Sequence, residues 1–162
     1  HADPHPLLGD ANNDGLVSRD DDEFLELVNP GAATMDLSGW RIRDEVRVRF
    51  TFPPNSLLES GCALVVFGGE VKEESIGGSQ VFTAGSLGLN NSGDTIVVED
   101  TNGAVRFSIG YGPEGGQDQS LTRSPDLTGG LPLVLHSSLP EAEGALFSPG
   151  TRIDGSTFEN CP

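Results

Sequence analysis

Lysine, tryptophan and long apolar runs are nearly absent from this sequence, and the absences exclude several classes of protein. Lys72 is the single lysine, and nine basic residues stand against 25 acidic ones, which gives a formal net charge of −16. A charge of that sign repels polyanions, so we expect no nucleic-acid partner. No apolar stretch approaches 18 residues and no signal-peptide pattern opens the chain, so we expect no membrane insertion.

The motifs of common enzyme classes are missing too. There is no Gly-x-Ser-x-Gly elbow, no glycine-rich phosphate loop and no His-Glu-x-x-His. His136 precedes Ser137 and is a candidate general base, but a strand-end histidine bonded to backbone is the simpler interpretation. His1 is a candidate copper ligand, yet no motif supplies a second histidine. The many carboxylates could include a glycosidase-type pair, but no spacing indicates one, so we expect no enzymatic activity.

Helical periodicity is also absent. No apolar pattern of period 3.6 persists for ten residues, whereas period-2 alternation recurs, most clearly in 46–52 before Pro53. The apolar run 62–67 lies between glycines and is typical of a central strand buried on both faces. The pair Asn102-Gly103 predicts a hairpin. Further strands are predicted at 24–28, 41–43, 81–82, 95–99, 104–111, 120–123 and 133–136.

These short strands predict an all-β fold with essentially no helix. Seven to nine strands separated by turns are typical of an antiparallel β-sandwich made of two packed sheets. The length favours a single domain over 1–162. We divide it into an N-terminal extension or truncated first strand, an acidic loop, a sandwich core and a C-terminal tail, at 1–9, 10–23, 24–151 and 152–162.

The acidic loop is the clearest chemical motif. With Asp10 as position 1, oxygen-bearing groups recur at positions 3, 5, 7, 9 and 12 of a calcium loop, and Gly15 permits the tight turn. Position 12 is Asp rather than Glu, and no amphipathic helix flanks the loop. Four adjacent carboxylates at 20–23 repel one another unless a cation offsets them, whereas the alternative is a bare turn rich in Asn, Asp and Gly. The predicted Ca²⁺ ligands are Asp10, Asn12, Asp14, the Leu16 carbonyl and Asp21, with Asp22 or Glu23 completing the shell and Ser18 at position 9.

Cys62 and Cys161 are the only cysteines, and no Cys-x-x-Cys indicates zinc or redox chemistry. A disulfide between them would close a loop of about 100 residues and stabilise the fold by about 4–5 kcal/mol in the chain-entropy model. The alternative is a buried thiol at Cys62 and a loose one near the C-terminus. High acidity, a calcium-type loop and scarce lysine favour an extracellular location, where calcium is abundant.

Four arginines hold nearly half of the basic charge. Arg41, Arg43, Arg47 and Arg49 lie within nine residues on alternating positions and form a candidate anion patch. The ordinary alternative is a solvated strand face paired with cross-strand carboxylates. Trp40 follows a corner and is expected to seal one end of the core, with a sugar-stacking platform as its alternative role.

Six motifs in order resemble the lamin tail domain. They are Asp-Glu-Phe-Leu-Glu-Leu-Val-Asn-Pro at 22–30, Met-Asp-Leu-Ser-Gly-Trp-Arg-Ile at 35–42, Phe-Pro-Pro-Asn at 52–55, Leu-Asn-Asn-Ser-Gly-Asp-Thr at 89–95, Gln-Ser-Leu-Thr-Arg at 119–123 and Phe-Ser-Pro-Gly-Thr at 147–151. The resemblance implies an immunoglobulin-like β-sandwich. The loop before Asp-Glu-Phe resembles the bacterial members, which occur as secreted or surface modules, often fused to hydrolases or adhesive repeats. Those domains place an apolar strand ahead of the segment matching Ala2-Asp3-Pro4, so one sheet edge is expected to be incomplete here.

A nuclear lamin role is not implied, because a lamin rod needs long heptad repeats and none is present. The leading hypothesis is a non-enzymatic, calcium-stabilised extracellular module. It would serve adhesion, protein interaction or spacing within a larger secreted protein, with an unknown protein or cell-surface partner. The alternative is an accessory module that targets polysaccharide or nucleic acid for a secreted hydrolase.

Overall fold

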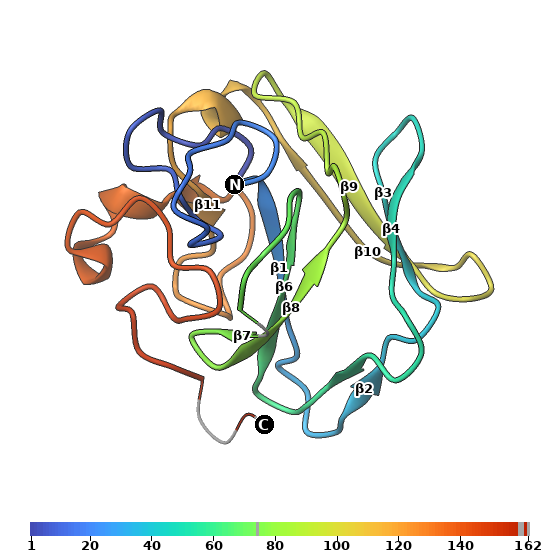
Figure 1. Cartoon of the computed structure of the whole chain (residues 1–162). Helices are drawn as coiled ribbons and strands as arrows, with labels where there is room; N and C mark the ends of the chain where they lie inside the picture. The colour runs from blue at the N-terminus through green and yellow to red at the C-terminus, as the bar shows by residue number, and fades with distance from the viewer. Residues whose placement is uncertain (74, 159–160, 162) are drawn as a thin grey trace.

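The computed structural model describes residues 1–73, 75–158 and 161 (Figure 1). The described residues form twelve strands, no α-helix and three short 3₁₀ turns. The strands are β1 (Phe24–Val28), β2 (Met35–Asp36), β3 (Arg41–Arg43), β4 (Val48–Thr51), β5 (Leu57–Leu58), β6 (Ala63–Phe67), β7 (Ser75–Ile76), β8 (Ser79–Thr83), β9 (Asp94–Glu99), β10 (Val105–Tyr111), β11 (Leu121–Thr122) and β12 (Val134–Leu135). The turns are η1 (Pro113–Gly116), η2 (His136–Ser138) and η3 (Pro140–Ala142). None of these elements is a helix long and apolar enough to cross a membrane.

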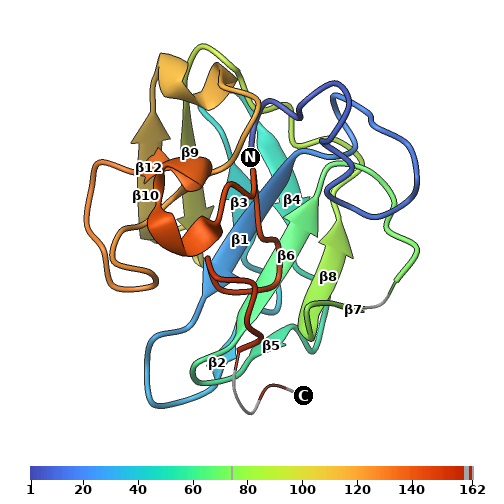
Figure 2. The same cartoon turned by 90° about the vertical axis from the view of Figure 1, so that its left-hand side faces the viewer.

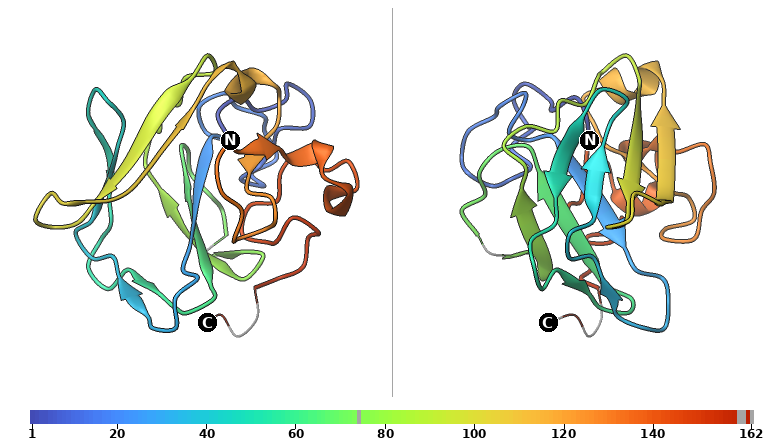
Figure 3. Two further views of the ribbon diagram at one scale, coloured as in Figure 1. Left: turned by 180° about the vertical axis from the view of Figure 1, so that it is seen from behind. Right: turned by 90° about the vertical axis from the view of Figure 1, so that its right-hand side faces the viewer.

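Two four-stranded sheets confirm the predicted all-β sandwich. The first has the order β1-β6-β8-β7 and the second β10-β9-β3-β4, and Figure 3 shows both from behind and from the side. One pairing differs from the antiparallel expectation, since β8 lies parallel to β6. The segment between them is long enough to carry the chain back to the start of β6. Gly77 and Gly78, both at positive φ, then reverse it into β8.

Strand β6 is buried on both faces, as its continuous apolar run predicts. Leu64 and Val66 point into the cluster between the two sheets, whereas Val65 and Phe67 point into a second cluster on the other side of the first sheet. The second cluster is covered by loop residues, among them Ala11. The N-terminal loop therefore packs on the sandwich as part of a third layer.

The C-terminal part of the chain covers the side of the molecule where β1 and β10 lie (Figure 2). Strands β11 and β12 pair with each other only, and the segment returns toward the first sheet. Cys161 is joined to Cys62 by a disulfide with a Cα–Cα distance of 5.5 Å across a sequence separation of 99. This bond ties the tail to the residue that precedes β6.

The predicted hairpin forms between β9 and β10, with Gly103 at φ 79° in its turn. The predicted strand at 46–52 is shorter than expected, because β4 begins at Val48. Val46 is 85% exposed, and its N–H donates to Asp44 Oδ1 at 2.7 Å. That side-chain bond holds Val46 in a turn, and alternation in the sequence did not reveal it.

Candidate functional site

The first half of the acidic loop brings two predicted ligands together. Asp10 Oδ1 and Asn12 Oδ1 accept hydrogen bonds from the same amide, that of Asp14, at 3.1 and 3.0 Å. Asp10 Oδ2 also accepts from the Gly15 N–H at 3.1 Å, and Gly15 has a φ of 89°. The turn therefore directs a carboxylate and an amide oxygen toward one point, which is the type of donor that calcium prefers.

Asp14 and Leu16 close the next turn of the loop. Asp14 Oδ1 accepts from the Leu16 N–H at 2.7 Å. The carbonyl of Asp14 accepts a hydrogen bond from Lys72 Nζ, so the single lysine of the chain lies beside the loop. The sequence contained no indication of that contact, because the two residues are far apart along the chain.

Asp22 braces the loop from within. Its side chain is fully buried, and Oδ1 accepts from the N–H groups of Ala11 and Asn12 at 2.8 and 3.1 Å. Oδ2 accepts from the Ser18 N–H at 2.8 Å. Burial raises the pKa of this carboxyl, although the three hydrogen bonds oppose the rise. Because Asp22 is fully buried and holds three loop amides, it is better placed to organise the loop than to ligate an ion.

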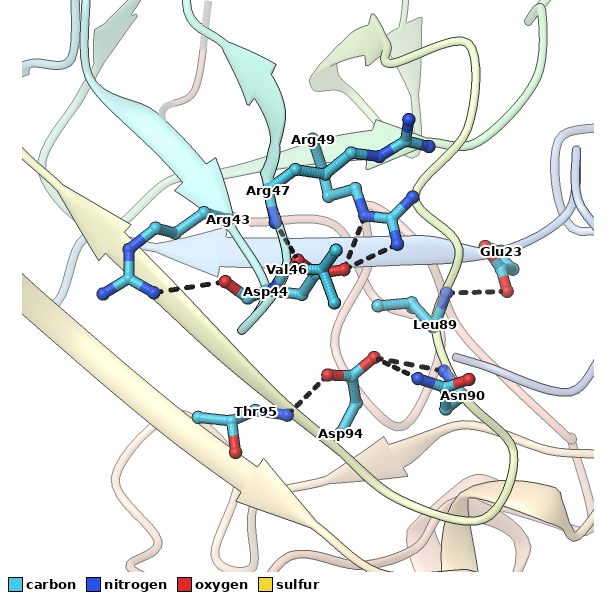
Figure 4. Close-up of polar contacts among 10 residues, drawn as sticks. All are labelled: Glu23, Arg43, Asp44, Val46, Arg47, Arg49, Leu89, Asn90, Asp94 and Thr95. Atoms are coloured by element: carbon cyan, nitrogen blue, oxygen red, sulfur yellow. Dashed lines mark hydrogen bonds and ion pairs between the residues drawn. The ribbon is translucent and has the colours of Figure 1, made fainter.

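Glu23 lies apart from the loop ligands. Its Oε1 accepts from the Leu89 N–H at 3.0 Å (Figure 4), and its Oε2 is buried without a hydrogen-bond partner among the described residues. Burial raises the pKa of Glu23 to about 7. Adjacent residues of an extended chain point to opposite faces, and Glu23 therefore faces away from Asp22. We remove Glu23 from the ligand set.

Asp21 remains next to the loop. Its N–H donates to Ser18 Oγ at 3.2 Å, and its side chain packs against Gly69, where a Cβ atom would collide with it. Within the described part of the chain, no three His, Cys, Asp or Glu side chains come close enough together to hold a metal ion. A calcium site in this loop would therefore depend on the Asn12 amide and a main-chain carbonyl as well as on carboxylates.

The arginines largely adopt the cross-strand alternative. Arg41 and Arg43 pair with Glu99 at 3.5 and 2.5 Å, and Arg49 pairs with Asp44 at 2.6 Å (Figure 4). Arg47 contributes its main-chain N–H to Asp44 Oδ1 at 2.7 Å. Its guanidinium makes no ion pair with the described residues. The candidate anion patch is therefore reduced to one free side chain.

His136 is buried and bonded on both ring nitrogens. Nδ1 lies 3.0 Å from the Ala145 carbonyl, and Nε2 lies 2.9 Å from Ser148 Oγ. Because a carbonyl only accepts, Nδ1 carries the proton and Nε2 accepts from the serine. Burial lowers the pKa of His136. The sequence suggested Ser137 as the partner, but its N–H bonds Gln119 instead, and the ring is oriented by a carbonyl rather than a carboxylate, unlike a nucleophilic triad.

Trp40 packs against the cluster between the sheets, as expected for a residue that seals the core. The Arg106 guanidinium lies over its ring at 5.9 Å from the centroid. The ring face is thus already stacked, and the exposed platform that sugar binding needs is not formed at Trp40.

A comparison with protein families finds one match. The family described as the Lamin Tail Domain matches residues 8–113, from the acidic loop through β10. The motifs at 119–123 and 147–151 lie beyond the matched range. Neither the curated proteins nor the solved structures yield a match.

Proposed function

The chain belongs to the lamin tail domain family, and on this premise we propose that it is a calcium-stabilised extracellular module for adhesion or spacing within a larger secreted protein. The family consists of non-catalytic, immunoglobulin-like β modules of the protein-interaction type. Calcium, the extracellular location and the adhesive role are the parts that we add.

The convergence of Asp10 and Asn12 on the Asp14 amide carries the calcium proposal. These residues, with Asp14, Asp21 and the Leu16 carbonyl, are the ones that would hold the ion. A bound Ca²⁺ would neutralise the loop carboxylates and fix the loop in one conformation. The loop is fastened to the sandwich, since Asn12 Nδ2 donates to the Glu70 carbonyl at 3.1 Å and the neighbouring Ala11 is buried in the second cluster. Binding in the loop therefore stabilises the packed domain rather than a free turn.

The disulfide supports the extracellular part of the proposal. Such bonds persist in oxidising compartments and are rare where glutathione keeps thiols reduced. The Cys62–Cys161 bond uses both cysteines of the chain. Millimolar calcium is available in the same compartments, which suits a module that needs the ion for stability and not for signalling.

Calorimetric titration of calcium into chelator-treated protein tests the proposal. We expect saturable binding of one ion, lost in Asp14→Ala. The matched control is Asp36→Ala, because Asp36 also accepts a turn amide, that of Ser38, at 2.9 Å but lies in a different part of the fold. Absence of calcium binding to the unmodified protein, or equal binding by Asp14→Ala and Asp36→Ala, would contradict the loop site.

A further inference from the structure

Among the described residues, no segment covers the outer face of the second sheet. Ile42 and Val98 belong to the cluster between the two sheets, and adjacent residues of a strand point to opposite faces. The outward positions of β3 and β9 are therefore Arg41, Arg43, Val97 and Glu99. The right-hand view of Figure 3 shows this face with none of the described segments in front of it, whereas loops pack on the outer side of the first sheet.

The register of the second sheet places two arginines beside one carboxylate on this face. Residues opposite each other in a ladder share a face. Glu99 is opposite Arg41, and Val97 is opposite Arg43. One glutamate is therefore shared by both guanidinium groups, with Arg43 Nε at 2.5 Å and Arg41 Nη2 at 3.5 Å from its oxygens.

Arg41 is the less completely bonded of the two arginines. The 3.5 Å contact with Glu99 is the only polar contact of its guanidinium group with the described residues, and its Nε is buried with no hydrogen-bond partner among them. The side chain is 38% exposed. A guanidinium group has five N–H donors in a fork that matches a carboxylate. A carboxylate supplied from outside can therefore bind the solvent-facing end of Arg41.

The spacing of the two arginines matches an extended ligand. A strand rises about 3.3 Å per residue, so Arg41 and Arg43 are about 6.6 Å apart along β3, as are carboxylates two residues apart in an extended partner. Val48 is opposite Arg43, and Val105 is opposite Glu99. These two valines are 44% and 55% exposed, and they add apolar surface on the two sides of the arginines.

Local charge permits an acidic partner here, although the chain carries a net charge of −16. The segments 41–51 and 94–111 contain five arginines and five carboxylates, so the net charge resides in the rest of the chain. The acidic loop packs beyond the first sheet, where Ala11 joins the second cluster. Sheets of a sandwich lie about 10 Å apart, and physiological salt screens charges beyond about 8 Å. Repulsion from the loop is therefore largely screened at the outer face of the second sheet.

We propose that the outer face of the second sheet binds an extended acidic segment of a partner protein, in which carboxylates on alternate residues contact Arg41 and Arg43. The inference rests on the proposed function and specifies the surface and the chemistry of the partner. Charge-assisted hydrogen bonds from arginine to carboxylate are stronger than neutral ones and supply the affinity. The period-2 spacing of the carboxylates supplies the specificity.

Two capped peptides of the same composition test the spacing. Acetyl-Ser-Glu-Ser-Glu-Ser-amide places both carboxylates on one face of an extended chain, whereas acetyl-Ser-Ser-Glu-Glu-Ser-amide places them on opposite faces. Titration into isotope-labelled protein, followed by NMR, should show saturable shifts at Arg41, Arg43 and Val97 with the first peptide. The second peptide should bind at least about tenfold more weakly, because one charge-assisted contact is lost. Equal affinities, shifts confined to other residues, or no binding would overturn the proposal.

A pair of arginine variants separates this site from general electrostatic attraction. Arg41→Gln and Arg47→Gln remove the same charge, but the Arg47 side chain is directed away from Arg43 (Figure 4). We expect Arg41→Gln to weaken binding of the first peptide at least tenfold and Arg47→Gln less than threefold, with calcium binding unchanged in both. Equal weakening by the two variants would overturn the inference alone, whereas absence of calcium binding by the unmodified protein would overturn only the proposed calcium site.

Discussion

Three turns of this molecule are closed by an aspartate in the same way, yet only two of them neutralise its charge internally. Asp44 Oδ1 accepts two turn amides and its Oδ2 pairs with Arg49. Asp100 repeats the arrangement in the β9–β10 hairpin, with amides on Oδ1 and Arg106 on Oδ2. Asp22 in the acidic loop holds three amides, but no ion pair of the described residues involves a loop carboxylate.

The carboxyl pKa values reflect this difference. Main-chain and arginine hydrogen bonds hold the pKa of Asp100 below its usual value, and they outweigh burial to do the same for Asp44. Burial raises the pKa of Asp22. The amide bonds alone are thus insufficient to offset burial in the loop. The loop contains Arg19, but no ion pair among the described residues joins it to a loop carboxylate. The calcium ion that we propose would supply the counter-charge that the other two turns obtain from an arginine.

The largest effect is expected from removing the brace of the loop. Asp22→Ala leaves two buried amides and one partly buried amide without an acceptor, and each orphaned donor costs about 1–3 kcal/mol. We expect the free energy of unfolding in urea to fall by about 3–5 kcal/mol, in chelator as well as in calcium. Asp36→Ala, which releases one exposed amide, should lose only a small fraction of that. Similar losses in the two variants would mean that the loop is not braced by Asp22.

Calcium itself should have the next largest effect. At a calcium concentration about 100 times the dissociation constant, one ion that binds only the folded state raises the free energy of unfolding by about 2.7 kcal/mol. For a domain of this size the melting temperature should rise by about 2–4 °C per kcal/mol. Asp14→Ala should remove most of the rise, and magnesium should replace calcium poorly because it requires a tighter octahedron. Identical melting curves in chelator and in millimolar calcium would contradict the binding of calcium by the loop.

Glu26 provides a buried carboxyl that has no arginine partner among the described residues. Burial raises the pKa of Glu26 in the folded protein to about 8, above the ordinary value of 4.5 that the residue has in an unfolded chain. The folded protein therefore retains a proton between these pH values that the unfolded chain releases, and this contribution to stability is lost as the pH rises. Between pH 5 and 7, the free energy of unfolding of the unmodified protein should fall by up to about 2 kcal/mol more than that of Glu26→Gln. Parallel pH profiles from urea unfolding would show that Glu26 is not buried as described.

The smallest effects should come from the arginines. Arg49→Ala leaves Asp44 without its counter-charge, and we expect the free energy of unfolding to fall by about 1 kcal/mol. Arg47→Ala removes an unpaired guanidinium, and the expected change is within about 0.5 kcal/mol. Thermal melts of both variants at low and high salt check this, and the Arg49 effect alone should shrink with salt. If Arg47→Ala proved the more damaging, its side chain would have a partner that the ion-pair geometry does not show.

The fold could be predicted where local chemistry decides it. Period-2 alternation located β10, the continuous apolar run located β6, and the Asn-Gly pair located the hairpin between β9 and β10. The parallel neighbour of β6 could not be predicted, because strand pairing depends on contacts far apart in sequence. The two-residue strands β2, β5 and β7 have no periodicity to detect.

The candidate site shows the same limit. Spacing indicated Asp10, Asn12 and Asp14 correctly as neighbours, since they lie in one tight turn. It did not indicate that Asp22 and Glu23 diverge, because which face of a chain is buried depends on what packs against it. Lys72 and Ser148 were missed for the same reason, as their partners Asp14 and His136 lie in other segments.

The bond between Cys62 and Cys161 has a mechanical consequence for a module that works under tension. A pull on the two ends of the chain passes through the cross-link, so the segment between the cysteines, which are separated by 99 in sequence, carries no load. At about 3.3–3.6 Å per residue, more than about 300 Å of chain is prevented from extending. Only the part before Cys62 can unravel, and it must first separate β1 from β6. As long as the bond is intact, a pull on the two ends of the chain cannot extend the segment between the two cysteines.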